Sequence, residues 1–313
     1  MLNYAVRRIL LAIPMLLVVF TIVFILVRVA PGDPAMAMLG QYASQEVLDA
    51  LRKEMGLDAP LWVQYLRFLR DLLRGDLGIS MLNGIPVTEQ LAVALPYTLE
   101  LTLGAMLVGM ILGIPLGVVT ALRRNQGVDY VGRVLSLAGI SIPSFYLGIL
   151  LLFFFAVNLH LFPVVGGGGE RNLLDRLHHL VLPALSLGLI MTSYIMRLTR
   201  STMLNVLNED FVRTARSKGL QERVVIYKHT LMNALIPIIS VMGIYFIINL
   251  GSSIMTEIVF SRPGLGKVMV MAMKQRDYVM LQSVMIVYST LAILVTLVID
   301  LLYGVVDPRI KYR

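Results

Sequence analysis

The sequence contains no cysteine and carries little charge. Without cysteine, the chain can form no disulfide bond, no thiolate nucleophile and no thiolate metal site. Charged residues make up only 15% of the 313 residues, whereas 58% are hydrophobic. A soluble domain of this size cannot bury so many apolar side chains. The composition therefore predicts an integral membrane protein.

Motifs for enzyme chemistry are also missing. A phosphate-binding P-loop needs glycine, four residues, then Gly-Lys-Ser or Gly-Lys-Thr. The closest string is SRPGLGKV at 261–268, which has serine in place of the first glycine and valine after Lys267. No HExxH or GxSxG sequence occurs, and the four histidines form a weak metal pattern. We expect no catalytic, cofactor or metal site in this chain.

Long apolar runs define the membrane topology. A transmembrane helix needs about 20 apolar residues to cross a hydrocarbon core about 30 Å thick. Six uncharged stretches meet or approach this length, and the fourth is the shortest: Ile9 to Val27, Leu101 to Leu122, Val134 to Leu159, Leu180 to Met196, Thr230 to Thr256 and Val279 to Ile299. The predicted fold class is an all-α polytopic membrane protein with six transmembrane helices.

The distribution of basic residues predicts the orientation. If the N-terminus is cytoplasmic, the segments on that side hold fifteen basic residues against five acidic ones. The other segments show no such excess, so both termini should face the cytoplasm. This asymmetry also accounts for the net charge of +8. We therefore expect no binding of nucleic acid, and we expect a multi-pass protein of the cytoplasmic membrane.

The chain divides into three parts on this reading. Residues 1–30 form the N-terminus and first helix, residues 31–98 an extracytoplasmic helical segment, and residues 99–313 the core with the other five helices. In the middle part, Ser44 and Gly56 bound one expected helix with apolar positions at helical spacing, and Pro60 and Gly75 bound a second. The segment could cap the helical bundle or dock a soluble partner.

Each of these two helices is expected to have one apolar face. In the first its positions are Val47, Leu48, Leu51 and Met55; in the second they are Leu61, Trp62, Tyr65, Leu66, Leu69 and Leu73.

Polar residues inside the apolar stretches point to an aqueous path. Pro143 removes a backbone donor, and in a bilayer the freed carbonyl needs another partner. Two serines flank that proline, and three polar residues lie in the fifth stretch. The candidate path residues are Ser141, Pro143, Ser144, Asn249, Ser252 and Ser253. The alternative is that these small and hydroxyl residues only join neighbouring helices.

A charged segment separates the fourth and fifth stretches, in a cytoplasmic loop at about 201–229. Between Leu204 and His229, apolar and basic residues alternate as in an amphipathic helix, which Gly219 would break. Such a helix could rest on anionic lipid or serve as the contact through which another protein moves this one. The candidate contact residues are Glu209, Asp210, Phe211, Val212, Arg213, Thr214, Ala215, Arg216, Lys218 and Gly219.

The order of residues in this segment resembles the coupling loop of the permeases of ATP-binding-cassette importers. Their pattern is E-A-A-x-x-x-G followed by I-x-L-P, and alignment on Gly219 places Arg213 on the glutamate and Met232 on the proline, two departures. The fuller strings are similar to the dipeptide and oligopeptide branch. They are EDFVRTARSKG, HTLMNALIP, PGDP, RGDLGIS, LPYTLEL, SIPSF and EIVFSRPGLG, which together span nearly the whole chain.

The resemblance implies a type I importer half with defined partners. These are a second, similar permease, two cytoplasmic ATPase subunits that hold ATP and magnesium, and an extracytoplasmic solute-binding protein. In that family a short helix such as 209–218 sits in a groove of one ATPase. Arg213 and Arg216 would then make polar contacts, Phe211, Val212 and Ala215 would form the packed face, and Gly219 would form the exit turn.

Peptides are the substrates that the resemblance favours. Nickel complexes, glutathione, opines and sugars are alternatives within similar permeases. A scaffold that binds a partner through the same loop without transporting a solute is an alternative from another class. An ion-coupled carrier is disfavoured, because no inverted repeat is evident.

Overall fold

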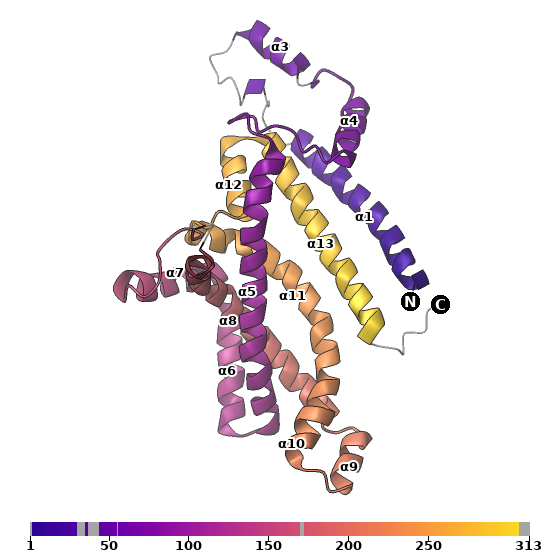
Figure 1. Cartoon of the computed structure of the whole chain (residues 1–313), viewed down its shortest axis with the longest axis vertical. Helices are drawn as coiled ribbons and strands as arrows, with labels where there is room; N and C mark the ends of the chain where they lie inside the picture. The colour runs from indigo at the N-terminus through magenta and orange to yellow at the C-terminus, as the bar shows by residue number, and fades with distance from the viewer. Residues whose placement is uncertain (1, 30–34, 37–43, 55, 170–171, 307–313) are drawn as a thin grey trace.

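The computed structural model describes residues 2–29, 35–36, 44–54, 56–169 and 172–306. Its helices form an elongated bundle with a small group of helices at each end (Figure 1). One group consists of α3 (Gln45–Glu54) and α4 (Leu61–Leu73), and the other of α9 (Asp210–Ser217) and α10 (Glu222–Val224). We name the two ends of the molecule the α4 end and the α9 end.

Five helical runs in the described part of the chain are long and apolar enough to cross a membrane, or six if one bent pair forms a single span. They agree with the expected stretches but are mostly longer, and the fourth, expected to be short, is a helix of 34 residues. The five are α1 (Leu2–Val29), α5 (Val87–Leu122), α8 (Leu173–Val206), the run of α10, η2 (Val225–Leu231) and α11 (Met232–Val259), and α13 (Tyr278–Val306).

The third expected span is a bent pair, with the break at Pro143, the proline that the sequence analysis singled out in this stretch. Helix α6 (Gly127–Ser141) is followed by α7 (Ser144–Leu151) and a π-helical continuation, η1 (Leu152–Asn158), and the two halves meet at 99°. The cause is Pro143, which has no N–H to donate and pushes the preceding residue out of the helical region. Ile142 accordingly has extended backbone angles, φ −89° and ψ 125°.

Helices α5 and α8 form the most extensive helix pair in the bundle. Gly109, Gly113 and Gly117 lie four residues apart on α5, and a Cβ atom at any of them would overlap or crowd side chains of α8. Gly188 of α8 lies equally close to Val108 of α5. Small residues at this spacing let helix backbones approach closely in a membrane, where lipid supplies no hydrophobic driving force for association. The glycines therefore set the spacing of the central pair.

The two helices expected within residues 31–98 are present as α3 and α4. The carbonyl of Ser44 accepts the amide of Leu48, Pro60 precedes the start of α4, and Gly56 and Gly75 follow the two helices with φ of +65° and +75°. These positive angles suit glycine, which has no Cβ to clash.

The expected apolar face of α4 is only partly buried. Tyr65, with Phe68, contacts Phe24 of α1. By contrast, Leu61, Trp62, Leu66 and Leu73 are exposed. On α3, Leu48 is buried and Val47 is exposed, while Met55 lies outside the described residues.

One helix was not expected from the sequence. Helix α12 (Leu265–Gln275) follows the PGLG string and lies near the α4 end of the bundle (Figure 1). Its residues Leu265 and Ala272 join a hydrophobic cluster with Val87 and Leu91 of α5 and with Val284 of α13. It is too short to cross a membrane, and it holds the ends of two spans together.

Candidate functional site

The amphipathic helix expected around residues 209–218 is α9. It projects from the α9 end of the bundle, beyond the end of α8 (Figure 1). The chain turns sharply at Gly219, where φ is +74°. A Cβ atom at Gly219 would meet no heavy atom within 4 Å, so the backbone angle, and not crowding, is what favours glycine there.

The buried face of α9 packs against this chain itself. Val212 and Ala215 are buried in a cluster with Val225 of η2, against which Val206 of α8 also packs. The expectation that Val212 and Ala215 form a face for a partner is therefore wrong, because their side chains are not accessible. Phe211 points outward and is 42% exposed. Among the predicted contact residues, all except Val212 and Ala215 are exposed: Glu209, Asp210, Phe211, Arg213, Thr214, Arg216, Lys218 and Gly219.

The two arginines of α9 have different surroundings. Arg216 donates to both oxygens of Glu222, at 2.7 and 3.3 Å, so it closes the turn around Gly219. This carboxylate raises the pKa of the Arg216 guanidinium above its ordinary value. Arg213 lies 3.5 Å from Asp210 and its side chain is 70% exposed. Only Arg213 therefore keeps a guanidinium that is largely available to another protein.

Helix α9 is linked directly to the base of a membrane span. Val225, which packs under α9, is the first residue of η2, and η2 continues into α11 without a break. The hydroxyl of Thr230 donates to the carbonyl of Val225 at 3.0 Å within this π-helical turn. π-Helical turns inside longer helices are often found at functional sites. A displacement of α9 would therefore be transmitted to α11.

A cavity of about 140 Å³ lies farther along α11, between this helix, α8 and the bend before α7. Ser144, Asn249 and Ser252, three of the predicted path residues, line it. Tyr194 of α8 and Tyr245 of α11 also line it, with ring centroids 5.1 Å apart. Sequence reasoning missed the two tyrosines, because their pairing depends on how α8 and α11 meet.

The other three predicted path residues do not line this cavity. Ser253 is fully buried and donates to the carbonyl of Leu250, and Ser141 donates to the carbonyl of Leu137. Pro143 directly precedes α7 and causes the bend. The structure therefore brings together three of the six predicted path residues, Ser144, Asn249 and Ser252, in one cavity.

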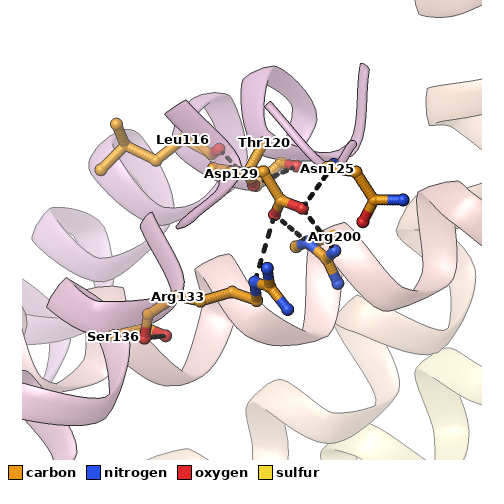
Figure 2. Close-up of polar contacts among 8 residues, drawn as sticks. Leu116, Thr120, Asn125, Asp129, Arg133, Ser136 and Arg200 are labelled. Carbon is orange, nitrogen blue, oxygen red and sulfur yellow. Dashed lines mark hydrogen bonds and ion pairs between the residues drawn. The ribbon is translucent and has the colours of Figure 1, made fainter. Parts of the chain in front are cut away.

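A buried carboxylate joins α6 to α8 near the α9 end. Asp129 is fully buried, and Arg200 donates to its two oxygens, at 2.6 Å to Oδ1 and 2.9 Å to Oδ2 (Figure 2). The backbone N–H of Asn125 donates to Oδ2 at 2.9 Å. Arg133 points at the same carboxylate, with its Nε atom 3.8 Å from Oδ1 (Figure 2). A charge buried in this way must be paired, so this ion pair fixes the two helices to each other.

A second buried carboxylate organises the loop before α12. Glu257 accepts the hydroxyl of Thr98 at 2.6 Å and the backbone N–H groups of Gly266 and Lys267 at 2.8 and 3.2 Å. A Cβ atom at Gly264 would overlap this carboxylate, which explains the glycine. The EIVFSRPGLG string therefore encodes a loop wrapped around its own first residue.

Arg262 extends the same polar cluster to the α4 end. It is fully buried, donates to Glu100 at 2.7 Å and lies over the ring of Tyr97, with its Cζ atom 5.1 Å from the ring centroid. Burial lowers the pKa of Arg262, and the charge of Glu100 opposes this effect. Arg176 of α8 binds the other oxygen of Glu100 at 2.7 Å. The loop before α12 is thus bound to α5 and α8 by charged groups.

Within the described part of the chain, no group of three or more histidine or acidic side chains could hold a metal ion. The arrangement combines the exposed helix α9, its continuous connection through η2 to α11, and a polar cavity beside α11.

Comparison with protein families gives two matches that together cover nearly the whole chain. Residues 113–312 match the family described as binding-protein-dependent transport system inner membrane component. Residues 1–102 match the N-terminal family of the membrane components of the same systems.

Individual proteins are similar over their full length. A glutathione transport system permease protein GsiC from Salmonella paratyphi A is 42% identical, with the alignment covering all of both chains. A dipeptide transport system permease protein DppB from Alkalihalophilus pseudofirmus is 39% identical, also over all of both chains. A structure of the MetNI methionine ABC transporter in an inward-facing conformation superimposes with a TM-score of 0.56 at 19% identity, over 70% of this chain and 96% of that one.

Proposed function

The chain belongs to the binding-protein-dependent transport system inner membrane components, as a multi-pass permease with the type I fold, and we propose that its ABC importer carries short peptides. Each importer of this kind needs a translocation path through the membrane. On this proposal the chain forms half of the path, and a second, similar permease forms the other half. The function is translocation and not catalysis.

The observation that carries the substrate proposal is the pair of full-length relatives. The relatives at 42% and 39% identity are named for glutathione and for dipeptides. Glutathione is a tripeptide, so both names describe short peptides with free carboxylate groups. Glutathione is the leading specific candidate, because seven relatives at 39% to 42% identity carry this name.

The proposed mechanism starts at α9. Two ATPase subunits would bind ATP and magnesium outside this chain, and one of them would hold the outward face of α9 through Phe211 and Arg213. When the ATPase pair closes, α9 would move with it, and η2 would pass the movement to α11. A contact of equal strength in both states would shift nothing, so the α9 contact must differ between the two states.

The cavity beside Tyr194 and Tyr245 is the proposed path. Ser144, Asn249 and Ser252 offer hydrogen-bonding groups to a solute, and the partner permease would complete the wall. Both termini and α9 would face the cytoplasm, as the distribution of basic residues predicts. Residues 31–98 would lie on the outer side and meet the solute-binding protein there.

The test is uptake in cells that lack this chain. Deletion should abolish ATP-dependent uptake of labelled glutathione or of a labelled dipeptide, and expression of the chain should restore it. Affinity purification should recover a second permease and ATPase subunits. If these subunits are recovered but uptake of both peptides is unchanged, the importer is retained and the peptide proposal fails. If no ATPase is recovered under conditions that preserve other transporters, the importer proposal fails and a scaffold function is favoured.

A further inference from the structure

A cavity of about 200 Å³ lies between α6 and α8, beside the Asp129–Arg200 ion pair. Arg133 of α6 and Arg197 and Arg200 of α8 line it, together with apolar and small side chains such as Leu137 and Met196. Three guanidinium groups around a largely apolar cavity form a strongly positive site. Arginine is the residue best suited to bind the oxygens of carboxylate and phosphate groups.

The charges at this cavity do not balance. Asp129 is the carboxylate next to Arg133 and Arg200, and its oxygens already accept hydrogen bonds from Arg200 and from the backbone of Asn125. Arg133 is 3.8 Å from it, which is too long for a hydrogen bond. The Nε atom of Arg133 is buried and has no acceptor among the described residues. A buried donor without an acceptor costs free energy.

Arg197 adds a further positive charge at the cavity. Its Cζ atom lies 6.0 Å from the ring centroid of Tyr194, and it forms no ion pair within the residues that the structure describes. The need to join α6 to α8 explains Asp129 and Arg200, which neutralise each other. Arg133 lies over the ring of Tyr130, with its Cζ atom 4.5 Å from the ring centroid, but its Nε atom still lacks an acceptor. Two positive charges beside an apolar cavity are best accounted for by an anion that binds there.

The surface next to the cavity indicates the kind of anion. Along α6, Tyr130, Val131, Val134, Leu135 and Leu137 are all more than half exposed. The side chain of Arg133 is 43% exposed on the same helix, so it can be reached from this surface. An anionic phospholipid has these two parts, a phosphate for the arginines and acyl chains for an apolar helix face. A free phosphate ion would use only the first part.

We propose that this cavity binds the phosphate group of an anionic phospholipid. Arg133 and Arg197 hold the phosphate oxygens, with the free Nε of Arg133 as one donor, and the acyl chains lie along the exposed face of α6. The Asp129–Arg200 pair keeps α6 and α8 at the distance that leaves room for the headgroup. This site is independent of the transported solute, and its occupancy would stabilise the bent pair against α8.

Native mass spectrometry of the chain, purified with the subunits that accompany it, tests the proposal. The probes are phosphatidylglycerol and phosphatidylcholine with identical acyl chains, and inorganic phosphate as a competitor. The variant is Arg133→Gln/Arg197→Gln. Its matched control is Arg223→Gln/Lys228→Gln, which removes the same charge from exposed positions near the α9 end but outside the cavity.

We expect phosphatidylglycerol to be retained at least tenfold better than phosphatidylcholine. Each basic side chain contributes about 1 kcal/mol to binding of anionic lipid, so the cavity variant should bind about thirtyfold more weakly, while the control stays within about twofold. Arg133→Lys/Arg197→Lys keeps both positive charges and should keep most of the binding. If it does, the loss of binding in the glutamine variant is due to the lost charge and not to misfolding. Phosphatidylglycerol should also raise the Tm of the unmodified protein more than phosphatidylcholine does.

Three results would overturn the proposal. Equal retention of the two lipids would show that the charge plays no part. Equal losses in the cavity variant and its control would show that only total charge matters. Displacement of the lipid by millimolar inorganic phosphate would assign the cavity to a free anion instead.

Discussion

Arg216 and Glu222 face each other across the turn at Gly219, and the guanidinium donates to both oxygens of the carboxylate at 2.7 and 3.3 Å. Both side chains are about half exposed, at 43% and 56%, so the pair contributes little to global stability. Its effect is geometric, because it fixes the angle between α9 and the start of the α10–η2–α11 run. A fixed angle is needed if a movement of α9 is to be transmitted to α11.

The first prediction concerns this pair. Arg216→Glu places two acidic side chains together and should open the turn, while the charge exchange Arg216→Glu/Glu222→Arg should close it again. We expect uptake per ATP hydrolysed to fall several-fold in the single variant and to recover in the exchange. The free energy of unfolding should change by less than about 1 kcal/mol in both. Unchanged coupling in the single variant would refute a role for the turn.

The second prediction concerns Gly219. Alanine at φ +74° costs about 1–2 kcal/mol, and proline, which needs φ near −65°, cannot adopt this conformation. Gly219→Ala should weaken the coupling of ATP hydrolysis to uptake, and Gly219→Pro should abolish it while the protein stays in the membrane. Gly127→Ala is the control, since a Cβ atom there meets no heavy atom within 4 Å and needs no unusual φ. Wild-type transport by Gly219→Pro would contradict the assignment.

The third prediction separates the two faces of α9. Phe211→Asp changes a side chain that is 42% exposed, and should reduce recovery of ATPase subunits without lowering the Tm of the permease. Ala215→Glu forces a carboxylate into the cluster around Val212 and Val225, and should lower the Tm as well. Copurification and thermal unfolding measure the two effects. Equal Tm losses in both variants would show that Phe211 is structural.

The fourth prediction concerns the Asp129–Arg200 pair. Asp129→Asn leaves the Arg200 guanidinium without its counter-charge, and should cost about 3–5 kcal/mol of unfolding free energy. Asp129→Asn/Arg200→Gln removes both charges and should recover most of the loss. Denaturation in detergent measures both. If the double variant is no more stable than the single one, the hydrogen bond to Asn125 is the main contribution instead.

The fifth prediction concerns the cavity beside α11. Ser252→Phe should fill much of its volume of about 140 Å³ and lower the rate of peptide uptake at least tenfold. Met255→Phe adds an aromatic ring one turn further along the same helix, at an exposed position outside the cavity, and should have little effect on uptake. Uptake assays with equal amounts of membrane-inserted protein measure the difference. Similar losses in both variants would argue against a path at Ser252.

Local signals in the sequence predicted much of this fold. The long apolar stretches became membrane-crossing helices because their length and composition permit little else in a bilayer. Ser44, Pro60 and Gly75 marked the ends of α3 and α4 correctly, since helix ends are determined within a few residues. The position of the turn at Gly219 was predicted for the same reason.

Long-range packing accounts for what the sequence did not reveal. The buried face of α9 is the one that packs against Val225, and Val225 lies beyond the turn at Gly219. The sequence of α9 alone does not show this contact. The tyrosine pair of the cavity joins two different spans, and Arg262 meets Glu100 from 162 positions away. The severity of the bend at Pro143 was also not predictable, because proline breaks a helix without fixing the direction in which the chain continues.

That bend has a consequence for how the protein enters the membrane. Helix α6 has 15 residues, and α7 with η1 has another 15, so each half is only about 22 Å long. Neither half is long enough to cross the hydrocarbon core alone, so a crossing at this point needs both halves together. Because α8 follows the bend and contacts both halves, stable insertion of this segment depends on residues synthesised after it, so the order of synthesis becomes part of the assembly pathway.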